Sequence, residues 1–232
     1  DDPRMARRST MQRFARWHIW IGWAAALPLL VWLLSGLIMT LRPIEEVRGT
    51  TLGIEAPARA VTVALNGSAQ GTLIREGRIL NQRGRSVLIA TYEDGSLGRI
   101  ELAPTGSHAL PPVDEAEARR AVAEGIKGGK SAVSARLFDA AYPPADFRRK
   151  IAVWQVTLAD GTHVYVGQGS GEIEAVRTRW WRFYDFFWGL HIMDPVEREN
   201  SSHPLLWLFS VLALGSSLLG TVLLFRRRRA RR

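Results

Sequence analysis

The chain has 232 residues, of which 47% are hydrophobic and 23% charged, and it contains no cysteine. The lack of cysteine excludes disulfide bonds, c-type haem attachment and cysteine-ligated iron–sulfur clusters in this chain. The net charge of +9 lies in the tails, because residues 1–16 carry +3 and residues 226–232 carry +6. The basic charge thus belongs to the two tails, which adjoin the long apolar runs near the chain ends, and the region between them is neutral overall; this argues against nucleic-acid binding.

Two long runs without any charged residue lie near the ends of the chain, at residues 19–41 and 204–225. Each reaches the roughly 20 apolar residues that a bilayer-crossing helix needs. We therefore predict transmembrane helices at residues 19–41 and 203–225. A secretory signal is the alternative for the first run, but this run is longer than a typical signal core and lacks a small-residue cleavage site after it.

Arginine-rich segments flank both predicted helices on the sides that face the chain ends. Short basic flanks are retained in the cytoplasm, so we expect residues 1–18 and 226–232 to be cytoplasmic. The segment between the helices then lies on the far side of the membrane. A bacterial inner-membrane protein with a periplasmic central domain fits this pattern best.

The periplasmic domain, predicted at residues 42–179, is expected to be α+β. Short β-branched and apolar runs at residues 61–65, 72–74, 86–92 and 99–102 predict strands. Turns are predicted between them at Asn66-Gly67, Glu76-Gly77 and Asp94-Gly95.

A helix is predicted to follow these strands, from Asp114 to about Ala123. Asp114 is a suitable N-cap, and Glu117 three residues later completes a capping-box pattern. Alternating residues at 151–158 and 163–166 around Asp160-Gly161 predict a hairpin, and residues 172–176 predict a further strand. The expected fold is one main helix packed against an antiparallel sheet.

Aromatic side chains dominate residues 180–188, which carry few charges. Tryptophan and tyrosine are enriched where a membrane meets water. We therefore predict that residues 180–202 form an interfacial aromatic segment leading into the second transmembrane helix.

Three segments, in this order, resemble the PepSY-associated transmembrane protein family. They are Trp17-His18-Ile19-Trp20-Ile21-Gly22 with Ser35-Gly36; the helix after Asp114 with Val153-Trp154-Gln155-Val156, Val164-Tyr165-Val166 and Ser170-Gly171-Glu172-Ile173; and Phe187-Trp188-Gly189-Leu190-His191 with Gly215 and Leu219-Gly220. Together they extend over nearly the whole chain, with the PepSY-like part at about residues 112–178.

The resemblance implies a PepSY module held at the membrane, of a kind associated with contacts to other proteins or with inhibition of partner enzymes such as peptidases. It also implies a link to iron acquisition. Some longer relatives are haem-containing ferric-siderophore reductases, in which histidines at these motif positions ligate b-type haem. The present chain has only two predicted membrane helices, unlike those reductases.

His18, His191 and His203 are therefore the candidate haem ligands. His18 lies at the cytoplasmic end of the first predicted helix, whereas His191 and His203 lie before the second, on the other side of the bilayer. His18 and His191 of one chain are thus predicted not to share an iron. A homodimer would pair each histidine with its copy, and Gly22, Ala26, Ser216 and Gly220 would allow close helix contact. The alternative is that these histidines only bridge lipid headgroups.

Other catalytic signals are weak. Asp114, Glu115 and Glu117 are best explained as helix-start residues favoured by the helix dipole. Neither glycine-rich stretch has the lysine and helix of a phosphate-binding loop. We therefore predict a non-catalytic accessory or regulatory subunit that contacts a membrane or periplasmic partner. The alternative is a b-haem electron carrier or ferric reductase acting as a homodimer.

Overall fold

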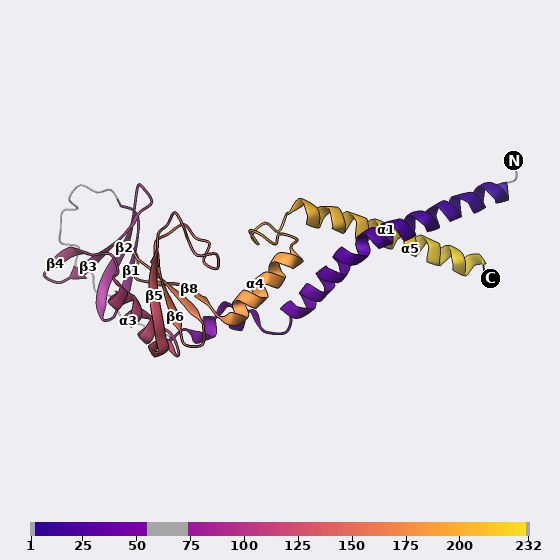
Figure 1. The fold of residues 1–232 in the computed structure, drawn as a ribbon. Helices are drawn as coiled ribbons and strands as arrows, with labels where there is room; N and C mark the ends of the chain where they lie inside the picture. The colour runs from indigo at the N-terminus through magenta and orange to yellow at the C-terminus, as the bar shows by residue number, and fades with distance from the viewer. Residues whose placement is uncertain (1–2, 55–73, 231–232) are drawn as a thin grey trace. The chain divides into compact units, whose positions relative to one another are not determined.

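Figure 1 shows the protein as a computed structural model, which describes residues 3–54 and 74–230. The chain folds as two units. The helical unit consists of residues 1–43 and 183–232, and the sheet unit consists of residues 44–182. The layout of two long apolar helices near the chain ends, with an antiparallel β-sheet domain between them, agrees with the sequence prediction.

The two long helices of the helical unit contain the apolar runs. Helix α1 (Pro3–Met39) includes Gln12–Met39, and α5 (Pro204–Ala230) includes Pro204–Phe225. Both stretches are long and apolar enough to cross a membrane. Apolar side chains surround each helix and are mostly exposed, a pattern typical of helices in lipid. Helix α1 starts well before residue 19, so most of the predicted cytoplasmic tail is helical.

Small residues line the contact between α1 and α5. Ala25 of α1 is buried, and Gly22 faces Ser216 of α5, whose Oγ lies 3.7 Å from the position that a Cβ on Gly22 would take. Small side chains let two apolar helices approach closely and gain dispersion contacts. The two helices therefore pack against each other within one chain (Figure 1).

Helix α4 (Arg179–His191) contains the aromatic residues of the predicted interfacial segment. A loop held by its own hydrogen bonds connects α4 to α5. Asp185 binds Arg198 at 2.6 Å, and the indole Nε1 of Trp188 donates to the Arg198 carbonyl at 3.1 Å. The carboxylate of Asp194 accepts hydrogen bonds from three backbone amides of the loop. These bonds fix the end of α4, where His191 lies.

The sheet unit begins with two short helical segments, α2 (Ile44–Arg48) and η1 (Thr50–Leu52), and then forms two four-stranded antiparallel sheets. The first sheet is a meander. Its strands in order are β1 (Ile74–Gln82), β2 (Arg85–Tyr92), β3 (Leu97–Ala103) and β4 (Gly106–Leu110).

The second sheet carries helix α3 (Glu115–Gly125) and the short η2 (Gly129–Ser131). Buried valines of the helix and the strands, with Val113, Ala118 and Ile126, form the core between them. The strands in order are β5 (Ala132–Phe138), β6 (Val153–Leu158), β7 (His163–Gly167) and β8 (Ile173–Arg177).

Helix α3 begins where the sequence predicts, because the Asp114 carboxylate accepts the backbone amide of Glu117 at 2.7 Å. The prediction that the Glu117 side chain completes a capping box was wrong. Its carboxylate instead accepts two hydrogen bonds from Arg99 of β3, at 2.7 and 3.0 Å. This ion pair joins the first sheet to the helix of the second.

Some strand predictions were wrong or incomplete. The turn predicted at Glu76-Gly77 lies inside β1, where Glu76 pairs with Thr91 and Gly77 with Ala90 of β2. Strands β4 and β5 were not predicted, nor was β1 beyond Ile74, and residues 72 and 73 of the predicted strand lie outside the described residues. The strands form two sheets, where one was predicted. The strand predicted at residues 61–65 and the turn at Asn66-Gly67 lie outside the described residues.

Candidate functional site

His18 contacts helix α5 through its ring. Its Nδ1 lies 3.0 Å from the backbone carbonyl oxygen of Ser216. A carbonyl oxygen can only accept, so Nδ1 carries the proton and the neutral ring has its lone pair on Nε2. The ring also packs on Gly220, where a Cβ would lie 3.0 Å from the His18 Cε1. Glycine at 220 therefore makes room for this imidazole.

His191 is held in the same manner near the other end of the described part of α1. Its Nδ1 lies 3.2 Å from the carbonyl oxygen of Trp32 and 3.1 Å from the Oγ of Ser35. The imidazole stacks on the Trp32 ring at 5.0 Å between centroids. It also packs on Gly36, where a Cβ would lie 3.2 Å from Cε1. Again the Nδ1 proton goes to a carbonyl, and the lone pair is on Nε2.

The two histidines lie at different levels of the helical unit. His18 and Trp32 are 14 positions apart on α1, a rise of about 21 Å. Each level therefore supplies one of these imidazoles. Bis-histidine haem needs two imidazoles facing one iron, and His18 and His191 of one chain are too far apart along the helices to share one.

In the part of the chain that the structure describes, His203 makes no hydrogen bond to a carbonyl of another helix, unlike His18 and His191. Its Nδ1 accepts the backbone amide of Leu205 at 3.3 Å, which caps the start of α5. The structure thus gives this third predicted ligand a local role. The small residues expected to serve a dimer are also engaged within one chain, since Gly22 faces Ser216 and Gly220 faces His18.

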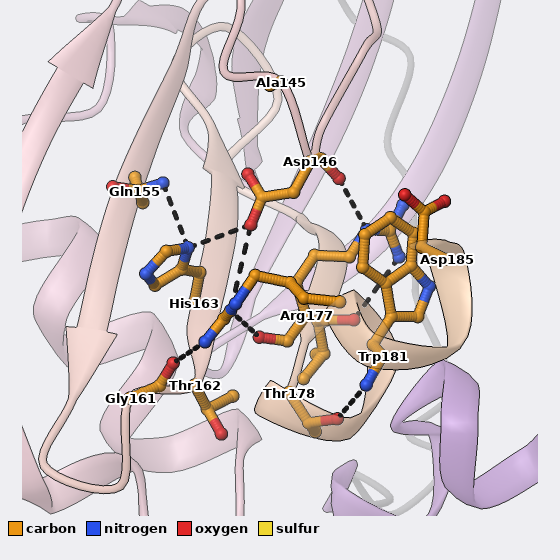
Figure 2. Close-up of polar contacts among 12 residues, drawn as sticks. Ala145, Asp146, Gln155, Gly161, Thr162, His163, Arg177, Thr178, Trp181 and Asp185 are labelled. Carbon is orange, nitrogen blue, oxygen red and sulfur yellow. Dashed lines mark hydrogen bonds and ion pairs between the residues drawn. The ribbon is translucent and has the colours of Figure 1, made fainter. Parts of the chain in front are cut away.

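The sheet unit contains a polar cluster that sequence analysis did not find (Figure 2). Asp146 lies in the loop between β5 and β6 and accepts hydrogen bonds from His163 Nδ1, at 2.9 Å, and from the Tyr165 hydroxyl, both on β7. Gln155 of β6 completes the cluster, with its Nε2 beside the His163 ring and the Tyr165 oxygen. His163 was predicted only as a strand residue.

Asp146 also connects this loop to the start of α4. Its backbone carbonyl accepts Arg177 Nε at 2.8 Å, and its carboxylate lies 3.9 Å from the guanidinium of Arg182 (Figure 2 shows the surroundings). The neighbouring Phe147 is buried against Val153 and Tyr165. The loop is therefore fastened to the sheet by one polar and one apolar anchor.

The pKa values of the cluster follow from burial and hydrogen bonding. Burial pushes the pKa of Asp146 upward, but hydrogen bonds from His163 and Tyr165 outweigh it, so this pKa lies below its ordinary value. Burial raises the pKa of Tyr165, and the adjacent Asp146 carboxylate adds to the effect. The phenol of Tyr165 thus keeps its proton at neutral pH and donates it in the hydrogen bond to Asp146.

An Asp146→Asn variant is expected to loosen the loop by about 2 kcal/mol at pH 7, because hydrogen bonds to a charged acceptor are lost. The pKa of Asp146 is depressed in the folded state, so its contribution is present above the unfolded value and is lost as the pH falls below about 4. Amide hydrogen exchange of residues 139–151 would measure this. The difference in exchange protection between variant and wild type should shrink at pH 3. A difference that stays constant with pH would contradict the predicted role of the Asp146 charge.

The three carboxylates at the start of α3 have structural partners. Asp114 caps the helix, Glu115 pairs with Arg119 one turn later, and Glu117 binds Arg99 and Arg83. The hydrogen bond from Arg99 is the main cause of the lowered pKa of Glu117. Within residues 12–54 and 74–225, no group of three or more histidine and carboxylate side chains could hold a metal ion.

Comparisons with known protein families, curated proteins and solved structures gave no match.

Proposed function

We propose that this protein is a membrane-anchored PepSY-type module that serves as an accessory or regulatory subunit of a membrane or uptake system. The observation that carries the proposal is the position of the sheet unit in the chain. It is inserted between two apolar helices that pack against each other. Such an arrangement holds a folded domain at one face of a bilayer by both of its ends.

The PepSY assignment is supported by the order of elements in the second sheet. Helix α3, with its Asp114 cap, precedes four antiparallel strands, and the Gly171-Glu172-Ile173 motif leads into the last of them. This order matches the helix, hairpin and Gly-Glu-Ile ending on which the family resemblance rests. The basic tails support an inner-membrane location with both tails in the cytoplasm and the sheet unit in the periplasm.

Strand β5 supports a role in protein contact. It is the first strand in the order of the second sheet and pairs with β6 on one side. Two of its apolar side chains, Val133 and Leu137, are 63% and 42% exposed. An edge strand with exposed apolar residues is a surface to which a partner's extended segment can add.

A photo-crosslinking residue in place of Val133 tests this role. In native membranes we expect one adduct of constant mass at Val133. The same residue in place of the exposed Ser107 on β4 should give none. If Val133 forms no adduct while the protein is abundant in the membrane, the accessory-subunit proposal is contradicted.

The second candidate function is a b-haem electron carrier or ferric-siderophore reductase that acts as a homodimer. The observation that favours it is the orientation of His18 and His191, whose Nδ1 atoms face backbone carbonyls. Metal-binding histidines characteristically donate their other ring N–H in this way, which leaves Nε2 for the metal. A bound haem would supply one-electron transfer, and a second copy of the chain would have to supply the second imidazole at each level.

Absorption spectra of the detergent-purified protein, oxidised and reduced with dithionite, distinguish the two functions. The haem hypothesis predicts a Soret band that weakens in His18→Ala and in His191→Ala and persists in His203→Ala, because His203 caps α5. A colourless protein from haem-replete cells would eliminate the hypothesis. A band that is unchanged in both variants would assign haem to other residues.

A further inference from the structure

A group of basic side chains gathers on the sheet unit next to helix α4. Arg148, Arg149 and Lys150 lie in the loop between β5 and β6, while Arg177 and Arg179 lie at the end of β8 and the start of α4. Arg182 follows one turn later. We call these six residues the basic face. Their charges contrast with the near-neutral total of the region between the chain's basic tails.

Contacts inside the sheet unit bring the two segments of the basic face together. The guanidinium groups of Arg177 and Arg148 both lie over the ring of Trp181, at 4.2 and 5.9 Å from its centre. Trp181 is itself fixed by the hydrogen bond from its backbone amide to the Thr178 hydroxyl (Figure 2). The ring therefore joins residues that are 29 positions apart in sequence.

The remaining members are placed by their neighbours. Arg182 donates to the carbonyls of Gly161 and Arg177, at 2.7 and 3.0 Å. Arg179 lies beside Gly161, where its Nε would be 2.6 Å from an added Cβ. Arg149 pairs with Glu174 of β8 but keeps 54% of its side chain exposed, and Lys150 is also exposed.

The loop that presents Arg148–Lys150 is rigidly held. Asp146 binds β7 through His163 and Tyr165, and Phe147 is buried in a small apolar cluster. Two successive anchors immediately before three cations fix where those cations point. Preorganised charges lose less conformational entropy on binding than charges on a free loop.

We propose that the basic face docks on the anionic phospholipid headgroups of the membrane that holds the helices. This inference rests on the proposed membrane anchoring. Chain continuity argues for lipid as the partner, because Arg182 lies within the predicted interfacial aromatic segment, residues 180–202, and Arg179 directly precedes that segment. Arginine and tryptophan together are typical of the headgroup level. Each cation near an anionic surface strengthens binding about fivefold.

The chain's lack of cysteine allows a direct test in the full-length protein. A fluorophore is attached to the cysteine of Lys150→Cys, and its fluorescence is measured in nanodiscs that contain a quencher lipid with a spin label on its headgroup. We expect stronger quenching in discs with phosphatidylglycerol than in discs of phosphatidylcholine alone, and the difference should vanish in 0.5 M salt. A fluorophore on Ser107→Cys should show no dependence on lipid charge.

Adding Arg149→Gln and Arg179→Gln should lower the ratio of docked to undocked sheet unit by about 30-fold in the anionic discs. The matched control, Arg75→Gln with Arg78→Gln, removes two exposed cations from β1 and should leave the quenching unchanged. Equal quenching in neutral and anionic discs would overturn the docking proposal while leaving membrane anchoring intact. Failure of the chain to enter discs at all would instead refute the anchoring.

Discussion

Replacing Arg99 by methionine is expected to lower the free energy of unfolding of the sheet unit by about 3–5 kcal/mol. The Arg99 side chain is 3% exposed and binds both oxygens of Glu117. It also donates to the Pro111 carbonyl at 2.8 Å. Its loss leaves the Glu117 carboxylate with its ion pair to Arg83 and the more distant charge of Arg85, and removes the hydrogen bonds that join β3 to α3.

Hydrogen exchange of β6 and β7 in the full-length protein measures this loss. The control is Arg85→Met, because the Arg85–Glu101 pair is largely exposed on the arginine side and should cost less than about 1 kcal/mol. The double variant Arg99→Met with Glu117→Met should be more stable than Arg99→Met alone, since it removes the unpaired charge. If both arginine variants cost the same, the buried pair has no special role.

Gly129→Ala is expected to destabilise the sheet unit by about 3 kcal/mol or more. A Cβ at this position would lie 2.0 Å from the backbone oxygen of Val122 and 3.0 Å from the Cα of Ala123. Both atoms belong to the backbone of α3, so no side-chain rotation can relieve the clash. The helix would have to move away from η2, and the buried Val122 would lose core contacts.

The matched control is Gly53→Ala, where the nearest atom would be a carbonyl oxygen at 3.4 Å and the backbone φ of −61° is ordinary. The free energy of unfolding is measured by denaturant unfolding, followed by near-ultraviolet circular dichroism. It should fall strongly in Gly129→Ala and change little in Gly53→Ala. Equal stability of the two variants would show that α3 and η2 are not packed as tightly as described.

The parts of the fold that were predicted correctly have strong local signals. The apolar runs, the Asp114 cap and the Asp160-Gly161 hairpin each depend on residues that are close in sequence. Strand β4 was missed because residues 106–110 contain no β-branched side chain and gain their pairing from β3. The Glu76-Gly77 turn was wrong because pairing with β2 outweighs the local turn preference of glycine.

The candidate site was only partly predictable for the same reason. His18 and His191 were identified from their motifs, but their partners are backbone carbonyls on other helices, whose positions depend on helix packing. Asp146 was missed because it lies in a loop of ordinary composition and gains its role from β7. Contacts that join distant segments leave little trace in a single sequence.

We propose that both apolar helices cross the membrane, with the sheet unit on one side and both chain ends on the other. Single cysteines in this cysteine-free chain test it directly, with a membrane-impermeant maleimide applied to spheroplasts. Tyr142→Cys, at a site 82% exposed in the sheet unit, should be labelled in intact spheroplasts. Arg232→Cys should be labelled only after lysis. Labelling of both cysteines in intact spheroplasts, or of Arg232→Cys alone, would contradict the claim.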